Sequence, residues 1–241
     1  ITLDDSTYPR LLASVLSFIA LSWRRRFHLV IDLEVYSKFS TILSTLPCAG
    51  DRAGYYVITT LFRNGLYTHL VYYNRQRHVQ EAYRQLGLAL GVDAEMGRPA
   101  SPHVSDAERQ SVRARLGQWG SGGRRLLLVN PNAGDLCLER RWLPERFARL
   151  AAHFSAREDT AVVLTGTPAE AEYTESVRQM ITPELRTRVM NAAGALDFGE
   201  FLALIERADV LVTGDSGPLQ LAVALGTPTV SVFGPCAPEA Y

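Results

Sequence analysis

The sequence predicts an α/β protein whose parallel sheets are covered by helices on both faces. Three observations support this class. Short apolar runs alternate with longer segments of helical periodicity. The runs are apolar at nearly every position, as in strands that are buried on both sides. Most of them end in turns that combine glycine with small or hydroxyl side chains, and ligands bind at these ends of parallel strands.

The second half of the chain shows the alternation most clearly. Its predicted strands cover residues 126–129, 161–164, 189–190, 210–213 and 229–233. Its predicted helices cover residues 144–154, a segment that opens at 167–170, and residues 198–205 and 218–225. Each helix lies between two strands, so right-handed crossovers and a parallel sheet are expected.

The first half repeats this pattern less completely. Its predicted helices cover residues 11–23, 37–46 and 78–90, and its predicted strands cover residues 27–33 and 54–57. Residues 58–76 resemble a loop. A parallel sheet usually has about five or six strands, and only two are predicted before residue 60. We therefore expect an N-terminal domain that is incomplete in this chain.

The domain boundary is predicted from a linker and a helix start. Residues 97–102 are rich in glycine and proline, and Ser105 and Glu108 form a capping box that opens a helix. Residues 120–123, Gly-Ser-Gly-Gly, separate this helix from the second half. We expect a partial N-terminal domain with a linker helix over residues 1–120, and a C-terminal domain over residues 121–241 that is cut short at its end.

The composition is that of a folded protein with no net charge and hence no strong electrostatic field. Of 241 residues, 47% are hydrophobic and 21% are charged, with 25 basic residues against 25 acidic ones. These values exclude a disordered tail and indicate no nucleic-acid partner. The three cysteines and five histidines are scattered, so we expect free thiols and no metal site.

The apolar run over residues 11–23 is too short to span a bilayer, which takes about twenty residues. A helix packed against a sheet is the preferred interpretation, and an interfacial anchor is the alternative.

The turns after the predicted strands are expected to form one polar, glycine-lined rim. They cover residues 130–134, 165–168, 191–194, 213–217 and 233–235. Asn132 and Gly166 belong to this rim as candidate substrate contacts. Ser216 and Gly217 open the helix that follows, where free amides and the helix dipole favour a phosphate. Asp215 either caps this helix or accepts hydrogen bonds from sugar hydroxyls.

For three further side chains the sequence allows two interpretations each, one functional and one structural. Gln220, one turn into that helix, either faces the ligand or lies on the surface. Arg140 is either a solvated cation or a stabiliser of charge on a departing diphosphate. Glu170 either completes a capping box with Thr167 or binds ribose hydroxyls. The dinucleotide fingerprint, the P-loop and the nucleophile elbow are all missing from the sequence.

Five stretches resemble the ADP-heptose:lipopolysaccharide heptosyltransferases and related family-nine glycosyltransferases. They are V-N-P-N-A at 129–133, R-R-W-L-P-E-R-F at 140–147, V-V-L-T-G-T-P-A-E at 162–170, A-D-V-L-V-T-G-D-S-G-P-L-Q-L-A at 208–222 and G-T-P-T-V-S-V-F-G-P at 226–235. Their order and spacing make the resemblance specific. It implies two Rossmann-like domains that face each other across a cleft, the GT-B type, with the donor held by the C-terminal domain.

The resemblance also implies the function. It implies a metal-independent inverting transferase that moves a heptose-like sugar from a nucleotide diphosphate sugar, with no other cofactor, to a saccharide or lipopolysaccharide-core-like glycolipid acceptor. Arg140 stands where the family usually has lysine, Glu170 near its ribose contact, and Asp215 to Gly217 at its diphosphate and sugar contacts. The general base is expected on a loop that precedes Ile1. A cytoplasmic location is implied, and it is compatible with peripheral association at the inner membrane.

The sequence departs from the family at three positions. Asn130 and Asn132 replace the histidine and glycine of a frequent His-Pro-Gly, and Gln220 replaces a frequent histidine. These changes leave the donor open. They also motivate a second hypothesis, a nucleotide-sugar-binding module without transfer activity.

Overall fold

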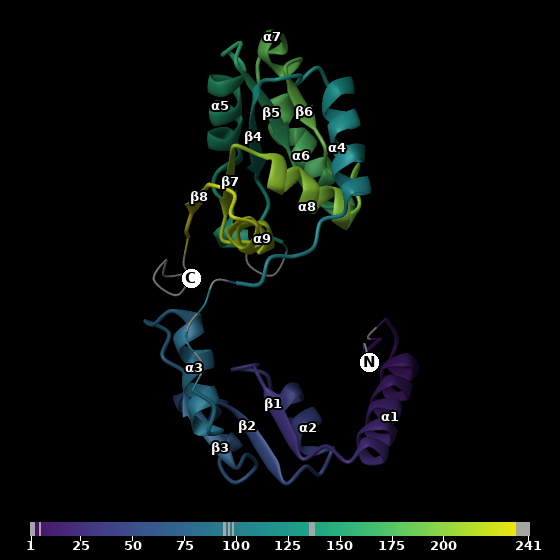
Figure 1. Cartoon of the computed structure of the whole chain (residues 1–241), viewed down its shortest axis with the longest axis vertical. Coiled ribbons are helices and arrows are strands. Elements are labelled where there is room, and N and C mark those ends of the chain that lie inside the picture. The colour runs from purple at the N-terminus through teal and green to yellow at the C-terminus, as the bar shows by residue number, and fades with distance from the viewer. Residues whose placement is uncertain are drawn as a thin grey trace. The chain divides into compact units, whose positions relative to one another are not determined.

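The computed structural model describes residues 3–4, 6–93, 95, 97, 99–134 and 138–234. Contacts divide the chain into a first unit that ends at Gly97 and a second unit that follows it. This boundary lies earlier than residue 120 and assigns the helix α4 (Asp106–Gln118) to the second unit. Each unit is an α/β body with its own parallel sheet (Figure 1).

The second unit contains a doubly wound sheet. Its strands are β4 (Arg125–Asn130), β5 (Thr160–Leu164), β6 (Val189–Asn191), β7 (Val210–Gly214) and β8 (Thr229–Val232). All pairs are parallel, in the order β6-β5-β4-β7-β8, and all five predicted strands are confirmed. The order reverses direction between β4 and β7, so the sheet has its switch point there.

Helices cover both faces of this sheet, as the apolar strands require. Along β4, Leu126 and Leu128 pack against α4, α8 (Phe198–Arg207) and α9 (Gly217–Leu225), whereas Leu127 and Val129 face the other helices. Those helices are α5 (Pro144–Ser155), α6 (Ala171–Gln179) and the short α7 (Pro183–Arg186), which was not predicted. Short 3₁₀ turns, η2 (Leu138–Arg140) and η3 (Pro168–Glu170), follow β4 and β5.

The first unit contains a three-stranded parallel sheet in the order β1-β2-β3. Its elements are α1 (Tyr8–Arg25), β1 (Leu29–Asp32), α2 (Lys38–Thr45), β2 (Asp51–Tyr56), η1 (Ile58–Arg63), β3 (His69–Tyr72) and α3 (Val79–Ala89). Tyr55 of β2 is fully buried and packs in one cluster with Leu86 of α3.

Two predictions for this unit are wrong. Residues 58–76 contain η1 and β3, so they are not a loop. Only Leu70 and Val71 are aliphatic in β3, which is an edge strand of the described sheet without a fully buried residue, so its sequence signal is weak. The helix α1 does not pack closely on a sheet, since Ser22 is its only buried residue and Leu12 and Leu16 are exposed. Among the described residues, no helix is long and apolar enough to cross a membrane.

Of the three cysteines, only Cys48 lies in the described part of the chain, where it is free and exposed. Cys137 and Cys236 lie outside the described residues.

The acid stability of the second unit is expected to depend on Glu175 of α6. Its carboxylate accepts hydrogen bonds from Arg178, Asn191 and Gln179, and these donors, Arg178 foremost, lower its pKa from 4.5 to about 2. Because the folded-state pKa is depressed, the stabilisation is complete above about pH 4.5 and is lost as the pH falls towards 2. Urea unfolding of Glu175→Gln should show a smaller loss of stability between these pH values than wild type. An equal loss in both proteins would contradict this assignment.

Candidate functional site

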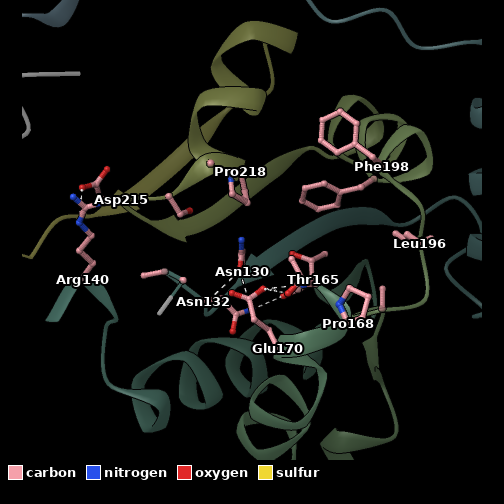
Figure 2. A pocket seen from close by; sticks show the side chains of 18 of the residues that line it. Asn130, Asn132, Arg140, Thr165, Pro168, Glu170, Leu196, Phe198, Asp215 and Pro218 are labelled. Atoms are coloured by element: carbon pink, nitrogen blue, oxygen red, sulfur yellow. Dashed lines mark hydrogen bonds and ion pairs between the residues drawn. The ribbon is translucent and has the colours of Figure 1, made fainter. Parts of the chain in front are cut away.

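A cavity of about 460 Å³ opens at the carboxyl ends of the central strands of the second unit. Its lining comes from the turns after β4, β5, β6 and β7, as Figure 2 shows for the labelled side chains. Four of the five predicted turns therefore meet at one cavity, which lies beside the switch point between β4 and β7. The fifth predicted turn, 233–235, contributes no lining residue among its described positions, and Pro235 lies outside the described part.

Arg140 and Asp215 form an ion pair at one end of the cavity (Figure 2). Arg140 Nε lies 3.6 Å from Asp215 Oδ2, and 37% of the arginine side chain is exposed, against 4% of the aspartate side chain. Gly214 permits this approach, because a Cβ there would lie 3.1 Å from the Arg140 carbonyl oxygen. The neighbouring Arg141 does not line the cavity, since its guanidinium stacks on the Tyr173 ring at 4.6 Å.

The start of α9 forms the cavity wall beside this pair. The helix begins at Gly217, and its N-cap residue is Ser216, whose hydroxyl lies 2.9 Å from Thr213 Oγ1. The N-cap is thus Ser216 and not Asp215. Ser216, Gly217 and Pro218 all line the cavity, whereas Gln220 is exposed and does not. The Ser216 and Gly217 amides at this helix start, next to a guanidinium, suit an anionic group, whereas Pro218 has no N–H to donate.

Asn132 and Gly166 form the floor of the cavity together. Asn132 Nδ2 donates to Asn130 Oδ1 at 3.1 Å and to the Thr165 carbonyl at 3.0 Å. Gly166 makes room for this amide, because a Cβ there would lie 2.8 Å from Asn132 Nδ2 and 2.9 Å from Thr174 Oγ1. The side-chain amide nitrogen of Asn132 therefore stabilises the turns that form the floor of the cavity.

Glu170 completes the predicted capping box. Its Oε2 accepts from the Thr167 amide at 2.8 Å and from Thr167 Oγ1 at 2.9 Å. The prediction that Glu170 forms a capping box with Thr167 is confirmed. Because Glu170 also lines the cavity, its contact with ribose stays a prediction.

Sequence reasoning missed the apolar wall at the opposite end of the cavity. Leu196, Phe198 and Phe201 line it, and Figure 2 shows Phe198 and Leu196 far from Arg140. Phe198 and Phe201 lie at helical spacing, which is typical of the buried face of an amphipathic helix, yet Phe198 is 66% exposed. The signal that marks this position is the capping box Asp197–Glu200, which places Phe198 at the first helical position, next to a strand-end turn.

The described residues show no metal-binding group. No cluster of three or more histidine, cysteine, aspartate or glutamate side chains could hold an ion there.

A family model described as glycosyltransferase family 9 (heptosyltransferase) matches residues 24–241. The chain belongs to this family. Lipooligosaccharide heptosyltransferase 2 of Haemophilus influenzae is 32% identical over 100 residues, which are 42% of this chain and 29% of that protein. The chain thus matches less than a third of that relative's length.

Two solved structures show the fold that the family-nine chain shares. The Escherichia coli ADP-heptose lipopolysaccharide heptosyltransferase II aligns with a TM-score of 0.71 and 22% identity, over 94% of this chain and 70% of that one. A family-nine glycosyltransferase of Veillonella parvula aligns with a TM-score of 0.75 and 23% identity, over 95% and 65%. The predicted two-domain GT-B class is confirmed.

Proposed function

We propose that the protein is a metal-independent inverting glycosyltransferase that uses a nucleotide diphosphate sugar as its donor. The observation that carries the proposal is the layout of the cavity. A guanidinium and a helix start lie at one end, and the exposed Phe198 with the partly buried Leu196 and Phe201 lies at the other. A nucleotide diphosphate has the same polarity, with charge at one end and a flat base at the other. The E. coli structure that aligns with this chain is an ADP-heptose heptosyltransferase, which supports a heptose-like sugar.

The residues around the cavity take distinct parts in the proposed reaction. Arg140 and the amides that open α9 bind the diphosphate, and Phe198 and Leu196 contact the base. Asn132 and Gly166 support the middle of the donor, and Glu170 lies within reach of its ribose. Asp215 orients Arg140 and accepts hydrogen bonds from the sugar.

The proposed chemistry is a single displacement. The acceptor hydroxyl oxygen attacks the anomeric carbon while the bond from that carbon to the diphosphate oxygen breaks, which inverts the configuration. The hydroxyl proton passes to a general base that is not among the residues proposed here for the donor site. The nucleoside diphosphate leaves with its negative charge stabilised by Arg140 and by the start of α9.

The acceptor is a saccharide or a glycolipid of the lipopolysaccharide-core type. A lipid-linked acceptor lies at a membrane, so the proposal includes peripheral association at the cytoplasmic face of the inner membrane.

Binding of nucleotide sugars to the purified protein tests the proposed donor site. ADP-heptose, other ADP-sugars and UDP-sugars should be titrated into the purified protein while thermal unfolding is followed. We expect at least one of them to raise the unfolding temperature, because a ligand that binds only the folded state stabilises it. No shift with any of these compounds would overturn the proposal.

A binding module without transfer activity is the second candidate. Gln220 lies outside the cavity, and the Asn132 side-chain amide donates to the Thr165 carbonyl in the cavity floor. At these two positions, where the chain departs from the family pattern, the side chains are therefore not available to the donor in the way that the usual family residues would be. Tight nucleotide binding without release of sugar to any acceptor would favour this alternative.

The apolar end of the cavity is expected to supply affinity for the base. Phe198→Ala should weaken ADP binding at least fivefold, about 1 kcal/mol, because stacking on an aromatic ring contributes about 1–3 kcal/mol per base. Binding of pyrophosphate, which has no base, should not change. Isothermal titration of both compounds checks this, with Met180→Ala as an exposed apolar control outside the cavity. Equal ADP affinity in Phe198→Ala and wild type would contradict the assignment.

A further inference from the structure

Helix α4 does not line the cavity, yet it is bonded to the segment that forms the apolar wall. One carboxylate makes most of these bonds. Glu200 of α8 is buried, and its Oε1 accepts from Ser111 Oγ at 2.6 Å and from Arg115 Nε at 3.0 Å. Its Oε2 accepts from Arg115 Nη2 at 3.2 Å and from the Asp197 amide at 3.2 Å. A single side chain therefore ties α4 to the first turn of α8.

A second contact fixes the distance between the two helices. A Cβ at Gly199 would overlap Glu108 Oε1 and lie 2.5 Å from Glu108 Cδ, so any side chain there must displace the Glu108 carboxyl group. Glu108 is itself held, because its Oε2 accepts from the Ser105 amide at 2.6 Å in the capping box of α4. The capping boxes of α4 and α8 thus interlock, with Gly199 pressed against Glu108.

This interlock holds the turn that carries the wall. Asp197, Phe198 and Phe201 line the cavity on the same turn as Gly199 and Glu200. Phe198 is two-thirds exposed, so its own packing does little to fix its position. The backbone of the first turn of α8 must do so, and the contacts with α4 hold that backbone. A preorganised wall binds its ligand at a lower entropic cost than a mobile one.

We propose that α4 is a positioning element for the base end of the donor site, and that Glu200 and Gly199 are positioning residues that act through Phe198. The inference rests on the proposed function for the identity of the ligand. It adds that residues outside the cavity, on the helix that opens the second unit, set the affinity for the nucleoside without contacting it.

Gly199→Ala tests the inference directly. Its methyl group must displace Glu108 or push α8 away, although alanine favours a helix more than glycine does. We expect ADP affinity to fall about tenfold, with pyrophosphate affinity within twofold of wild type. Gly117→Ala is the control, because a Cβ at that glycine of α4 meets nothing within 4 Å. The double variant Gly199→Ala/Glu108→Ala removes the obstructing carboxylate but keeps the bonds of Glu200 to Ser111 and Arg115, so it should restore ADP affinity to within threefold.

Ser111→Ala removes one hydrogen bond to Glu200 without adding bulk. This variant replaces Gly199→Ala in the test if Gly199→Ala fails to fold. It should weaken ADP binding about threefold and leave the affinity for pyrophosphate unchanged. A parallel fall for both ligands, or no change in ADP affinity in either single variant, would overturn the inference.

Hydrogen exchange of the unliganded protein separates this inference from the proposed function. We expect the amides of residues 197–201 to exchange about tenfold faster in Gly199→Ala than in Gly117→Ala, and the double variant to reverse this change. If the wild-type protein bound neither ADP nor pyrophosphate, the proposed function would fail and this measurement would still decide whether α4 positions the wall. Unchanged exchange in Gly199→Ala would overturn the positioning role.

Discussion

Arg140→Ala is expected to lower the rate of sugar transfer by more than tenfold, which corresponds to a loss of over ~1.4 kcal/mol in transition-state stabilisation. The guanidinium lines the cavity beside the start of α9, where the proposed diphosphate leaves. Negative charge grows on the leaving group as the bond to the sugar breaks. A fixed cation therefore stabilises the transition state more than the ground state.

Two matched variants separate this effect from a general loss of charge. Arg140→Lys keeps the cation at a position where the resembling family usually has lysine, and it should retain most of the activity. Arg149→Ala removes an exposed arginine of α5 that does not line the cavity, and it should not change the rate. Initial rates with saturating acceptor provide the comparison. If Arg140→Ala turned over as fast as wild type, Arg140 would be a surface charge.

Thermal unfolding must accompany these rates, because Arg140 is also the partner of a buried carboxylate. Removing one member of a buried pair destabilises a protein strongly. Here 37% of the arginine side chain is exposed, so solvent screens the pair and the loss of stability should stay below about 1 kcal/mol. The fold should therefore survive the substitution.

The sheet of the second unit could be predicted because its strands are buried on both faces. The run Leu126–Val129 contains only apolar residues, and the structure buries every one of them. The edge strand β3 carries no such signal, because none of its residues is fully buried and its sequence mixes histidine and tyrosine with leucine and valine. The edge strands β6 and β8 could still be predicted, because each precedes a glycine-containing turn in the alternation of strands and helices, whereas no such turn follows β3.

Some residues of the cavity could likewise be predicted from the sequence, and others could not. Strand-end turns can be located from sequence, because parallel topology gathers them at one edge, and seven of the eight proposed site residues line one cavity. Phe198 could not be found in this way, since an apolar residue at helical spacing indicates a core position. Its exposure and its place in the cavity lining show that this aromatic ring faces the cavity instead.

The second large effect is expected from Gly166→Ala, which should destabilise the protein by about 1–3 kcal/mol, the range for overpacked sites. The new methyl group would lie 2.8 Å from Asn132 Nδ2 and 2.9 Å from Thr174 Oγ1. Both neighbours are buried side chains and Asn132 is held by hydrogen bonds, so neither yields without losing a contact. Urea unfolding measures the loss, with Gly122→Ala as a control whose Cβ meets nothing within 4 Å.

A second substitution identifies Asn132 as the obstruction. Asn132→Gly restores the glycine that is frequent in the resembling family and removes one of the two clashing groups. Gly166→Ala should therefore cost less stability in the Asn132→Gly background than in wild type, because Thr174 and Ala193 still crowd the methyl group but Asn132 no longer does. Equal costs in the two backgrounds would mean that Asn132 does not determine the need for glycine at 166. A smaller cost would show that this chain's departure from the family pattern at 132 and its glycine at 166 form one packing unit beneath the donor site.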